Sequence, residues 1–204
     1  MCAKYLPTRG LIFDLDGTLV DSGLDFDAMR REMGLASGLP LLEAIDALDD
    51  ANATRCREIL ARHEWAGANT ARLMPGVREF LVSLAARGLH RAVLTRNSRQ
   101  IALSTLQRLE LDFDTVVARE DAPAKPDPTA IWRICEKWQL LPAEVAIIGD
   151  FRFDIEAGRR AGTRTVLYAA EAEPQDENGA ADADYCLHSY RDTAPLLAWL
   201  LESV

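Results

Sequence analysis

The sequence is poor in cysteine and in positive charge, and it has no long apolar run. Its four cysteines are scattered, with neither a C-x-x-C pair nor a histidine at zinc-ligand spacing. This pattern disfavours a disulfide scaffold and a structural zinc site. No apolar stretch approaches the length of a membrane-spanning helix. We therefore expect a cytoplasmic protein with reduced thiols and no membrane partner.

Basic residues are outnumbered by acidic ones, 23 to 32, which gives a formal net charge of −9. A surface of this sign repels nucleic acid and acidic lipids, so we expect neither as a partner. It also repels a small anionic substrate. A site for a phosphate ester would therefore need a metal ion or local cations to offset the field.

What the sequence does contain is an alternation of short apolar runs and longer amphipathic segments. The apolar runs predict buried strands at residues 10–13, 91–95, 115–118, 145–149 and 165–168, with a short edge strand at 185–187. The amphipathic segments predict helices at 76–87, 99–109, 128–138, 154–161 and 193–201. This alternation predicts an α/β fold with a mostly parallel sheet and helices on both faces.

Residues 22–74 interrupt this alternation, because their patterns are helical only, at 25–35 and 40–64. We expect a small all-helical cap inserted after the first strand, and a catalytic core formed by residues 1–21 and 75–204. Substrate recognition is expected from the cap, although arginine and tryptophan on helices usually cover a core or face solvent. The cap candidates are Phe26, Arg30, Arg31, Arg62, His63 and Trp65. The acidic segment 171–184 is predicted to be a mobile loop.

Two pairs of aspartates follow predicted strands. Asp14 and Asp16 come directly after the run G-L-I-F, and Asp150 and Asp154 stand in G-D-F-R-F-D after V-A-I-I-G. The carboxyl ends of parallel strands meet at one edge of the sheet, where ligands bind. Carboxylates so close repel one another unless a cation or a donor lies nearby. Asp14, Asp16 and Asp150 therefore predict an oxygen-ligand site suited to Mg²⁺; Asp154 could equally serve as a helix cap.

Two further polar residues have both a functional and an ordinary interpretation. Thr95, in L-T-R-N-S after the second strand, could cradle an anion or cap the next helix. Lys125, in A-K-P-D-P, would usually be an exposed lysine, but the predicted chemistry still needs a cation. With Mg²⁺ and Lys125 holding a phosphoryl group, Asp14 can attack as nucleophile and Asp16 can act as general acid and base.

The four motifs together resemble the haloacid dehalogenase superfamily, specifically its phosphatases with a small helical cap. They are D-L-D-G-T-L-V-D-S from Asp14, Thr95 in L-T-R-N-S, Lys125 in K-P-D-P, and G-D-F-R-F-D from Asp150. The segments M-P-G-V-R-E-F-L and A-D-Y-C-L also look like those of phosphoglycolate-phosphatase relatives. The resemblance implies a Rossmann-like three-layer core and a phosphatase that hydrolyses a small phosphorylated metabolite through an aspartyl-phosphate.

The same resemblance implies a role for each matching residue. Asp14, the main-chain carbonyl of Asp16, and Asp150 would bind Mg²⁺, and Asp154 would support the metal site from behind these ligands. Thr95, the amide of Arg96 and Lys125 would hold the phosphate. Phe151 departs from the pattern, because many relatives have Ser or Thr after the metal-binding aspartate. A dehalogenase is disfavoured by the aspartate at position 16, and a phosphonatase by the absence of lysine from residues 22–74.

Three other functions remain open at this stage. A phosphomutase of the β-phosphoglucomutase type shares all four motifs and differs in keeping water from the phosphoaspartate. A non-enzymatic receiver module that accepts phosphate on aspartate needs neither the D-x-D-G-T step nor a helical insertion. A degenerate binding protein would lack part of the catalytic set, which is complete in this sequence. Substrate identity and oligomeric state are not indicated by the sequence.

Overall fold

The computed structural model describes residues 5–170 and 182–203 of the chain. The chain divides into two compact units, one formed by Met1–Asp21 with Arg72–Val204 and the other by Ser22–Ala71. The inserted unit thus ends three residues before the boundary at residue 74 that the sequence suggested. Residues 171–181, most of the segment expected to form an acidic loop, lie outside the described residues.

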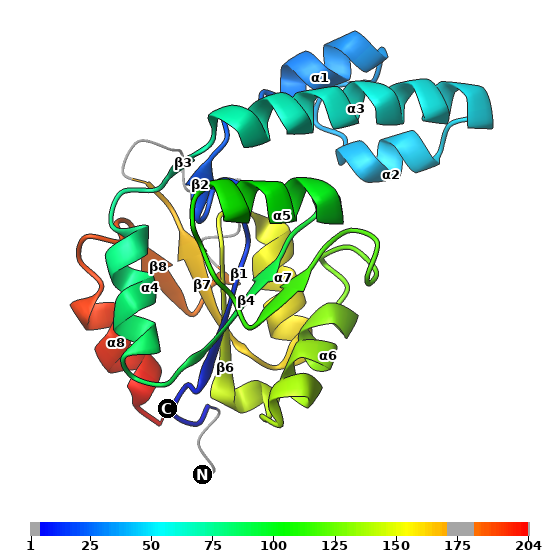
Figure 1. The fold of residues 1–204 in the computed structure, drawn as a ribbon. Coiled ribbons are helices and arrows are strands. Elements are labelled where there is room, and N and C mark those ends of the chain that lie inside the picture. The colour runs from blue at the N-terminus through cyan, green and yellow to red at the C-terminus, as the bar shows by residue number, and fades with distance from the viewer. Residues whose placement is uncertain (1–4, 171–181, 204) are drawn as a thin grey trace. The chain divides into compact units, whose positions relative to one another are not determined.

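A six-stranded parallel sheet forms the centre of the larger unit (Figure 1). The strand order is β5–β4–β1–β6–β7–β8. The strands are β1 (Gly10–Phe13), β4 (His90–Leu94), β5 (Thr115–Val117), β6 (Val145–Gly149), β7 (Arg164–Tyr168) and β8 (Tyr185–Leu187). Each of them coincides with an apolar run identified in the sequence, and the predicted α/β fold with a parallel sheet is confirmed.

Helices cover both faces of this sheet, as the pattern predicted. Figure 1 shows α4 and α8 on one side of the sheet, with α6 and α7 on the other. The helices of this unit are α4 (Val77–Ala85), α5 (Arg99–Arg108), α6 (Thr129–Trp138), α7 (Arg152–Ala161) and α8 (Ala194–Leu201), with a 3₁₀ turn at Pro142–Glu144. Among the described residues, no helix combines the length and apolar character that crossing a membrane requires.

All four residues of β1 are buried, which places this strand in the core. Ile12 packs into a cluster with apolar side chains of α6, α7 and the neighbouring strands. Phe13 contacts Phe80 of α4 and Phe113, with ring centroids 6.2 and 6.1 Å away. Burying one such apolar side chain away from water stabilises the folded state by roughly 1.5–3 kcal/mol. The packing therefore fixes the end of β1, where Asp14 begins the candidate site.

A second, two-stranded sheet joins the segments on either side of the insertion. Strand β2 (Val20–Asp21) pairs antiparallel with β3 (Arg72–Leu73), with Val20 opposite Leu73 and Asp21 opposite Arg72. Sequence analysis did not predict this pair, since two residues are too few to show an alternating pattern. The pairing belongs to the larger unit and brings both ends of the inserted segment together.

The inserted unit consists of α1 (Phe26–Met33), α2 (Leu41–Asp46) and α3 (Asp50–Thr70). Its own apolar core includes Met29, Ile45 and Cys56. The single helix expected over residues 40–64 is two helices, because the side chain of Asp49 accepts a hydrogen bond from the amide of Asn52 and starts a new helix. The insertion is therefore entirely helical, as predicted, with a different division.

Candidate active site

Three of the predicted site residues follow the carboxyl ends of neighbouring strands. Asp14 follows β1, Thr95 follows β4 and Asp150 follows β6. The amide of Asp14 donates to the carbonyl of Ile148 (2.9 Å), and the amide of Thr95 donates to that of Val117 (3.0 Å). The sheet ladder thus continues to these residues and holds their backbone at one edge of the sheet.

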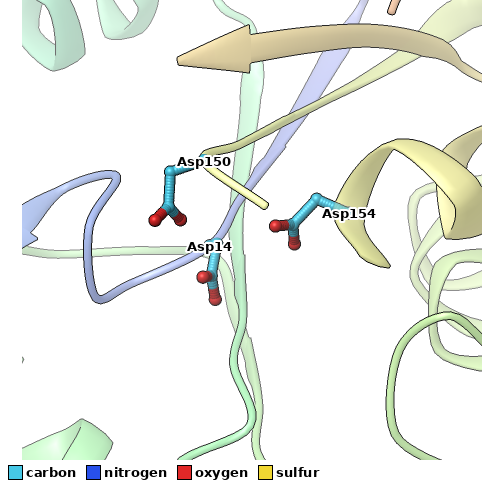
Figure 2. Close-up of side chains that lie close together, drawn as sticks. All are labelled: Asp14, Asp150 and Asp154. Atoms are coloured by element: carbon cyan, nitrogen blue, oxygen red, sulfur yellow. The ribbon is translucent and has the colours of Figure 1, made fainter. Parts of the chain in front are cut away.

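The carboxyl groups of Asp14, Asp150 and Asp154 lie close together, although they come from separate segments (Figure 2). Each offers an oxygen atom, and the three oxygens lie within 4.8 Å of one another. Burial, and then the charges of Asp14 and Asp154, raise the pKa of Asp150 well above its ordinary value. Oxygen-only donors under mutual repulsion fit a hard divalent cation such as Mg²⁺, which would relieve that repulsion.

Asp154 has a different place from the other two carboxylates. It is buried, and its two oxygens accept hydrogen bonds from the ammonium of Lys125 (2.5 Å) and the amide of Phe151 (3.2 Å). The second bond is that of a helix cap, so the cap interpretation of Asp154 applies, and its support of a metal site stays a prediction. Burial raises its pKa to about 6, although Lys125 opposes this. A Cβ at Gly149 would lie 2.1 Å from Cγ of Asp154, so glycine leaves room for this carboxylate.

Lys125 is buried, with 3% of its surface exposed, and joins three segments of the core. Its ammonium lies 2.7 Å from Oδ1 of Asp14 and donates to the carbonyl of Leu94 (2.9 Å), besides its bond to Asp154. Burial opposes the charged form, but the two carboxylates outweigh it and raise the pKa of Lys125. The lysine is therefore a fixed cation beside the predicted nucleophile and not an exposed, solvated side chain.

The loop after Asp14 is shaped to pass close to Asp150. Gly17 has a φ of 76°, in the left-handed region, and a Cβ there would lie 2.1 Å from Oδ2 of Asp150. The next residue, Thr18, is fully buried and its hydroxyl donates to Oδ1 of Asp150 (3.0 Å). Both residues belong to the D-L-D-G-T motif, but sequence analysis gave Thr18 no separate role. The D-x-D-G-T spacing was the available signal.

Asp16 is held by Asn97, a residue of the L-T-R-N-S motif to which sequence analysis gave no role at the site. The side-chain amide of Asn97 donates a hydrogen bond to Oδ2 of Asp16. The backbone amide of Asn97 donates to the hydroxyl of Thr95 (3.1 Å), and both residues are buried. The cap of α5 is Ser98, whose hydroxyl accepts from the amide of Ile101. Thr95 is thus not the cap of α5, and its expected role in phosphate binding stays a prediction.

Arg96 lies beside an aromatic pair within the second aspartate motif, between Asp150 and Asp154. Its guanidinium carbon is 5.1 Å from the ring centre of Phe153, which packs edge-on against Phe151 at 5.0 Å. Phe151 is 40% exposed, and its backbone amide, not its side chain, bonds to Asp154. The departure at position 151 therefore leaves the hydrogen bonding of Asp154 intact.

The candidate substrate-recognition residues of the insertion all lie in the helical unit. Arg62 and His63 of α3 both bond to Glu32 of α1. Arg30 bonds to Asp27 and to the carbonyl of Leu39. The bonds to Glu32 join α3 to α1, whereas Arg30 bonds within α1 and to the segment that precedes α2. Phe26, Arg31 and Trp65 complete the set, and the assignment of any of them to substrate binding stays a prediction.

A family model described as haloacid dehalogenase-like hydrolase matches residues 11–168. The chain is 33% identical to a haloacid dehalogenase-like hydrolase domain-containing protein of Arabidopsis thaliana, over 78% of this chain and 70% of the relative. It is 29% identical to an N-acetylmuramic acid 6-phosphate phosphatase of Pseudomonas aeruginosa, over 95% and 96%. It is 31% identical to a phosphoglycolate phosphatase of Nitrosospira multiformis, over 78% and 82%.

Solved structures share the same fold. A hydrolase from Pseudomonas syringae matches with a TM-score of 0.79 and 22% identity, over 96% of this chain and all of the other. A structure described as a predicted phosphoglycolate phosphatase from Haemophilus somnus matches with a TM-score of 0.75 and 22% identity, over 93% and 98%. At this identity the likeness concerns the fold, which agrees with the architecture described above.

Proposed function

Because the chain belongs to the haloacid dehalogenase-like hydrolase family and hydrolyses phosphate esters, we propose that it is a Mg²⁺-dependent phosphatase with Asp14 as its nucleophile. The main support is the position of Lys125, whose ammonium lies 2.7 Å from Asp14, on a sheet edge that also carries Asp150. One edge thus offers a fixed cation, a carboxylate nucleophile and oxygen ligands for a metal. The substrate is proposed to be a small phosphorylated metabolite.

The cation site is proposed to use the carboxylates of Asp14 and Asp150, with the main-chain carbonyl of Asp16 as a further ligand. Asp154 has both oxygens engaged by Lys125 and the amide of Phe151. It is therefore proposed to orient Lys125 and to add negative charge behind the ligands. Bound Mg²⁺ would neutralise charge on the phosphoryl oxygens.

The first half of the reaction is a transfer of the phosphoryl group to Asp14. A carboxylate oxygen of Asp14 attacks phosphorus in line, and the bond from phosphorus to the ester oxygen breaks. Asp16, protonated at this stage, gives its proton to the departing oxygen. Lys125 and the backbone amide of Arg96, with the hydroxyl of Thr95, are proposed to hold the phosphoryl oxygens.

The second half releases phosphate and restores the enzyme. Asp16, now a carboxylate, takes a proton from a water whose oxygen attacks phosphorus. The bond between phosphorus and Asp14 breaks, inorganic phosphate leaves, and Asp16 is again protonated. The hydrogen bond from Asn97 fixes Oδ2 of Asp16 and so directs which oxygen exchanges the proton.

The test is release of inorganic phosphate from a panel of phosphorylated metabolites, with Mg²⁺ and with EDTA. Phosphoglycolate and N-acetylmuramic acid 6-phosphate belong in the panel, because relatives carry these names. We expect activity with Mg²⁺ only. Asp14→Asn should lower kcat by about a thousandfold or more, since it removes the nucleophile. Full turnover by Asp14→Asn would refute the proposed mechanism.

The alternative functions give different results in the same assays. A phosphomutase would convert a sugar phosphate into its isomer and release little phosphate. A receiver module would still accept phosphate in the Asp16→Asn variant without any loss relative to the wild type. A phosphatase with that substitution should instead stall, and the phosphorylated protein should accumulate in intact mass spectrometry.

A further inference from the structure

The turn at residues 118–121, directly after β5, is organised by the carboxylate of Asp121. Its Oδ2 accepts a hydrogen bond from the amide of Ala118 (2.7 Å), and the amide of Asp121 donates to the carbonyl of Ala118 (3.0 Å). The guanidinium of Arg99, at the start of α5, donates to both oxygens of the same carboxylate. A two-pronged bond of this kind fixes direction as well as distance. Asp121 therefore joins the turn after β5 to the segment after β4.

Two further hydrogen bonds connect the same turn to the same segment. The amide of Arg119 donates to the carbonyl of Asn97 (3.0 Å). The carboxylate of Glu120 accepts a hydrogen bond from the backbone amide of Arg99 (2.9 Å). Three consecutive residues of the turn thus hold residues 97–99 from one side.

The segment held in this way carries Asn97, whose side-chain amide donates to Oδ2 of Asp16. The backbone of Asn97 is fixed at both of its polar groups, because its carbonyl accepts from Arg119 and its amide donates to the hydroxyl of Thr95 (3.1 Å). A fixed backbone determines where the short asparagine side chain can reach. The geometry of the bond to Asp16 therefore depends on the turn after β5.

The pair formed by Arg99 and Asp121 lies at the surface, with 46% and 29% of the two side chains exposed. The hydrogen bond from Arg99 is the largest influence on the pKa of Asp121 and lowers it, so both groups are charged at neutral pH. Ion pairs this exposed contribute little to folding stability. Loss of the pair should therefore displace the segment that carries Asn97 without unfolding the protein.

We propose that Asp121 is a positioning residue for turnover, which acts through Arg99 and the turn to hold Asn97 where its side chain bonds to Asp16. This inference rests on the proposed function, in which Asp16 is the general acid and base. Asp121 itself touches neither substrate nor metal. Because it acts through Asn97, its removal can lower kcat only as far as removal of the Asn97 side chain does.

The first test is the steady-state kinetics of Asp121→Ala. We expect kcat to fall about three- to tenfold, with little change in KM and in the melting temperature. A general loosening of the segment would instead raise KM, since Thr95 and the amide of Arg96 are proposed to hold phosphate. Arg99→Met should have the same effect on kcat, although it leaves the bond between Asp121 and Ala118 in place.

The second test combines Asp121→Ala with Asn97→Ala. If Asp121 acts through Asn97, the double variant should have the kcat of Asn97→Ala, within about 1.5-fold. Independent effects would multiply, and a multiplied loss would overturn the proposal. Should Asp121→Ala fail to fold, Arg99→Met takes its place in the same comparison.

Glu144→Ala is the matched control. The carboxylate of Glu144 also accepts from an amide three residues earlier, that of Leu141 (2.8 Å), and from an arginine, Arg9 (3.1 Å). It precedes β6, at the opposite end of that strand from Asp150. The control should leave kcat unchanged, and an equal loss in Glu144→Ala and Asp121→Ala would overturn the specific role of Asp121.

Failure of this inference differs from failure of the proposed function. Wild-type kcat in both Asp121→Ala and Arg99→Met would overturn the role of Asp121 and leave the phosphatase in place. A wild type that releases no phosphate from any phosphorylated metabolite with Mg²⁺ would overturn both.

Discussion

The side-chain amide of Asn97 donates a hydrogen bond to Asp16, a residue 81 positions earlier in the sequence. The bond joins the loop after β4 to the loop after β1, on neighbouring strands of the sheet. Its donor is itself fixed, because the backbone amide of Asn97 bonds to the hydroxyl of Thr95. Asp16 is therefore positioned by the same segment that is proposed to bind phosphate.

Asn97→Ala should slow turnover more than it weakens substrate binding. Losing one hydrogen bond to a carboxylate should raise the activation free energy by about 1.5 kcal/mol, which lowers kcat roughly tenfold. KM should change little, because Asn97 is not proposed to touch the substrate. Steady-state kinetics with Mg²⁺ measure both constants.

Ser98→Ala is the neighbouring control for that experiment. Ser98 caps α5 through the amide of Ile101, so its loss should lower stability by about 1 kcal/mol. It should not change kcat. If both variants lowered kcat equally, the effect would come from the loop as a whole, and the specific role of the bond to Asp16 would be wrong.

Lys125→Met should destabilise the protein and abolish activity. The ammonium is buried against Asp14 and Asp154, and its removal leaves these carboxylates uncompensated. Breaking a buried pair in this way costs about 3–5 kcal/mol. Chemical denaturation in EDTA measures the loss. Lys137→Met, at an exposed position of α6, should change stability little; a loss below about 1 kcal/mol for Lys125→Met would contradict the buried pair.

The strands and three site residues could be predicted because they share one local pattern. Asp14, Thr95 and Asp150 each end an apolar run, and parallel strands bring such ends to one edge. Lys125 ends no apolar run, and local sequence cannot distinguish a buried lysine from an exposed one. It was inferred from the charge that the chemistry needs. The structure places its ammonium between two carboxylates.

Asn97 could not be predicted for a physical reason. Asparagine in L-T-R-N-S is explained equally well by helix capping, and the structure gives that task to Ser98. Its bond to Asp16 joins two segments that lie far apart in the sequence. The break between α2 and α3 was missed because Asp49 lies inside a continuous helical pattern.

Asp150 should make the metal-free protein lose stability as the pH rises. Its pKa in the folded state lies above the unfolded value near 3.9, so the folded protein binds more protons between these values. This contribution is complete below about pH 4 and is lost as the pH rises through the folded pKa. Asp150→Asn lacks it. In EDTA, the stability of Asp150→Asn relative to wild type should therefore increase from pH 4 to pH 7.

The comparison uses a difference between two proteins because other carboxyl groups have the opposite slope. The pKa of Asp121 is lowered mainly by a hydrogen bond from Arg99, so its contribution to folding stability rises with pH. This contribution is the same in both proteins and cancels in the difference. Mg²⁺ competes with protons for Asp150, so its stabilisation of the wild type should grow with pH. Denaturation curves at each pH provide the measurement. The raised pKa would be contradicted if, in EDTA, the wild type became more stable relative to Asp150→Asn as the pH rises.

Gly17→Ala should damage the cation site by a steric route. Its φ of 76° makes a side chain unfavourable by about 1–2 kcal/mol, and the new Cβ would lie 2.1 Å from Oδ2 of Asp150. Gly88 has a similar φ of 68° but open space around the Cβ position. Gly88→Ala should therefore cost comparable stability and leave Mg²⁺ affinity unchanged. Gly17→Ala should lower that affinity at least about tenfold, because Asp150 must move away. Calorimetry of Mg²⁺ binding to both variants separates backbone strain from displacement of Asp150. Equal Mg²⁺ affinities of the two variants would show that the loop moves while the carboxylate of Asp150 stays in place.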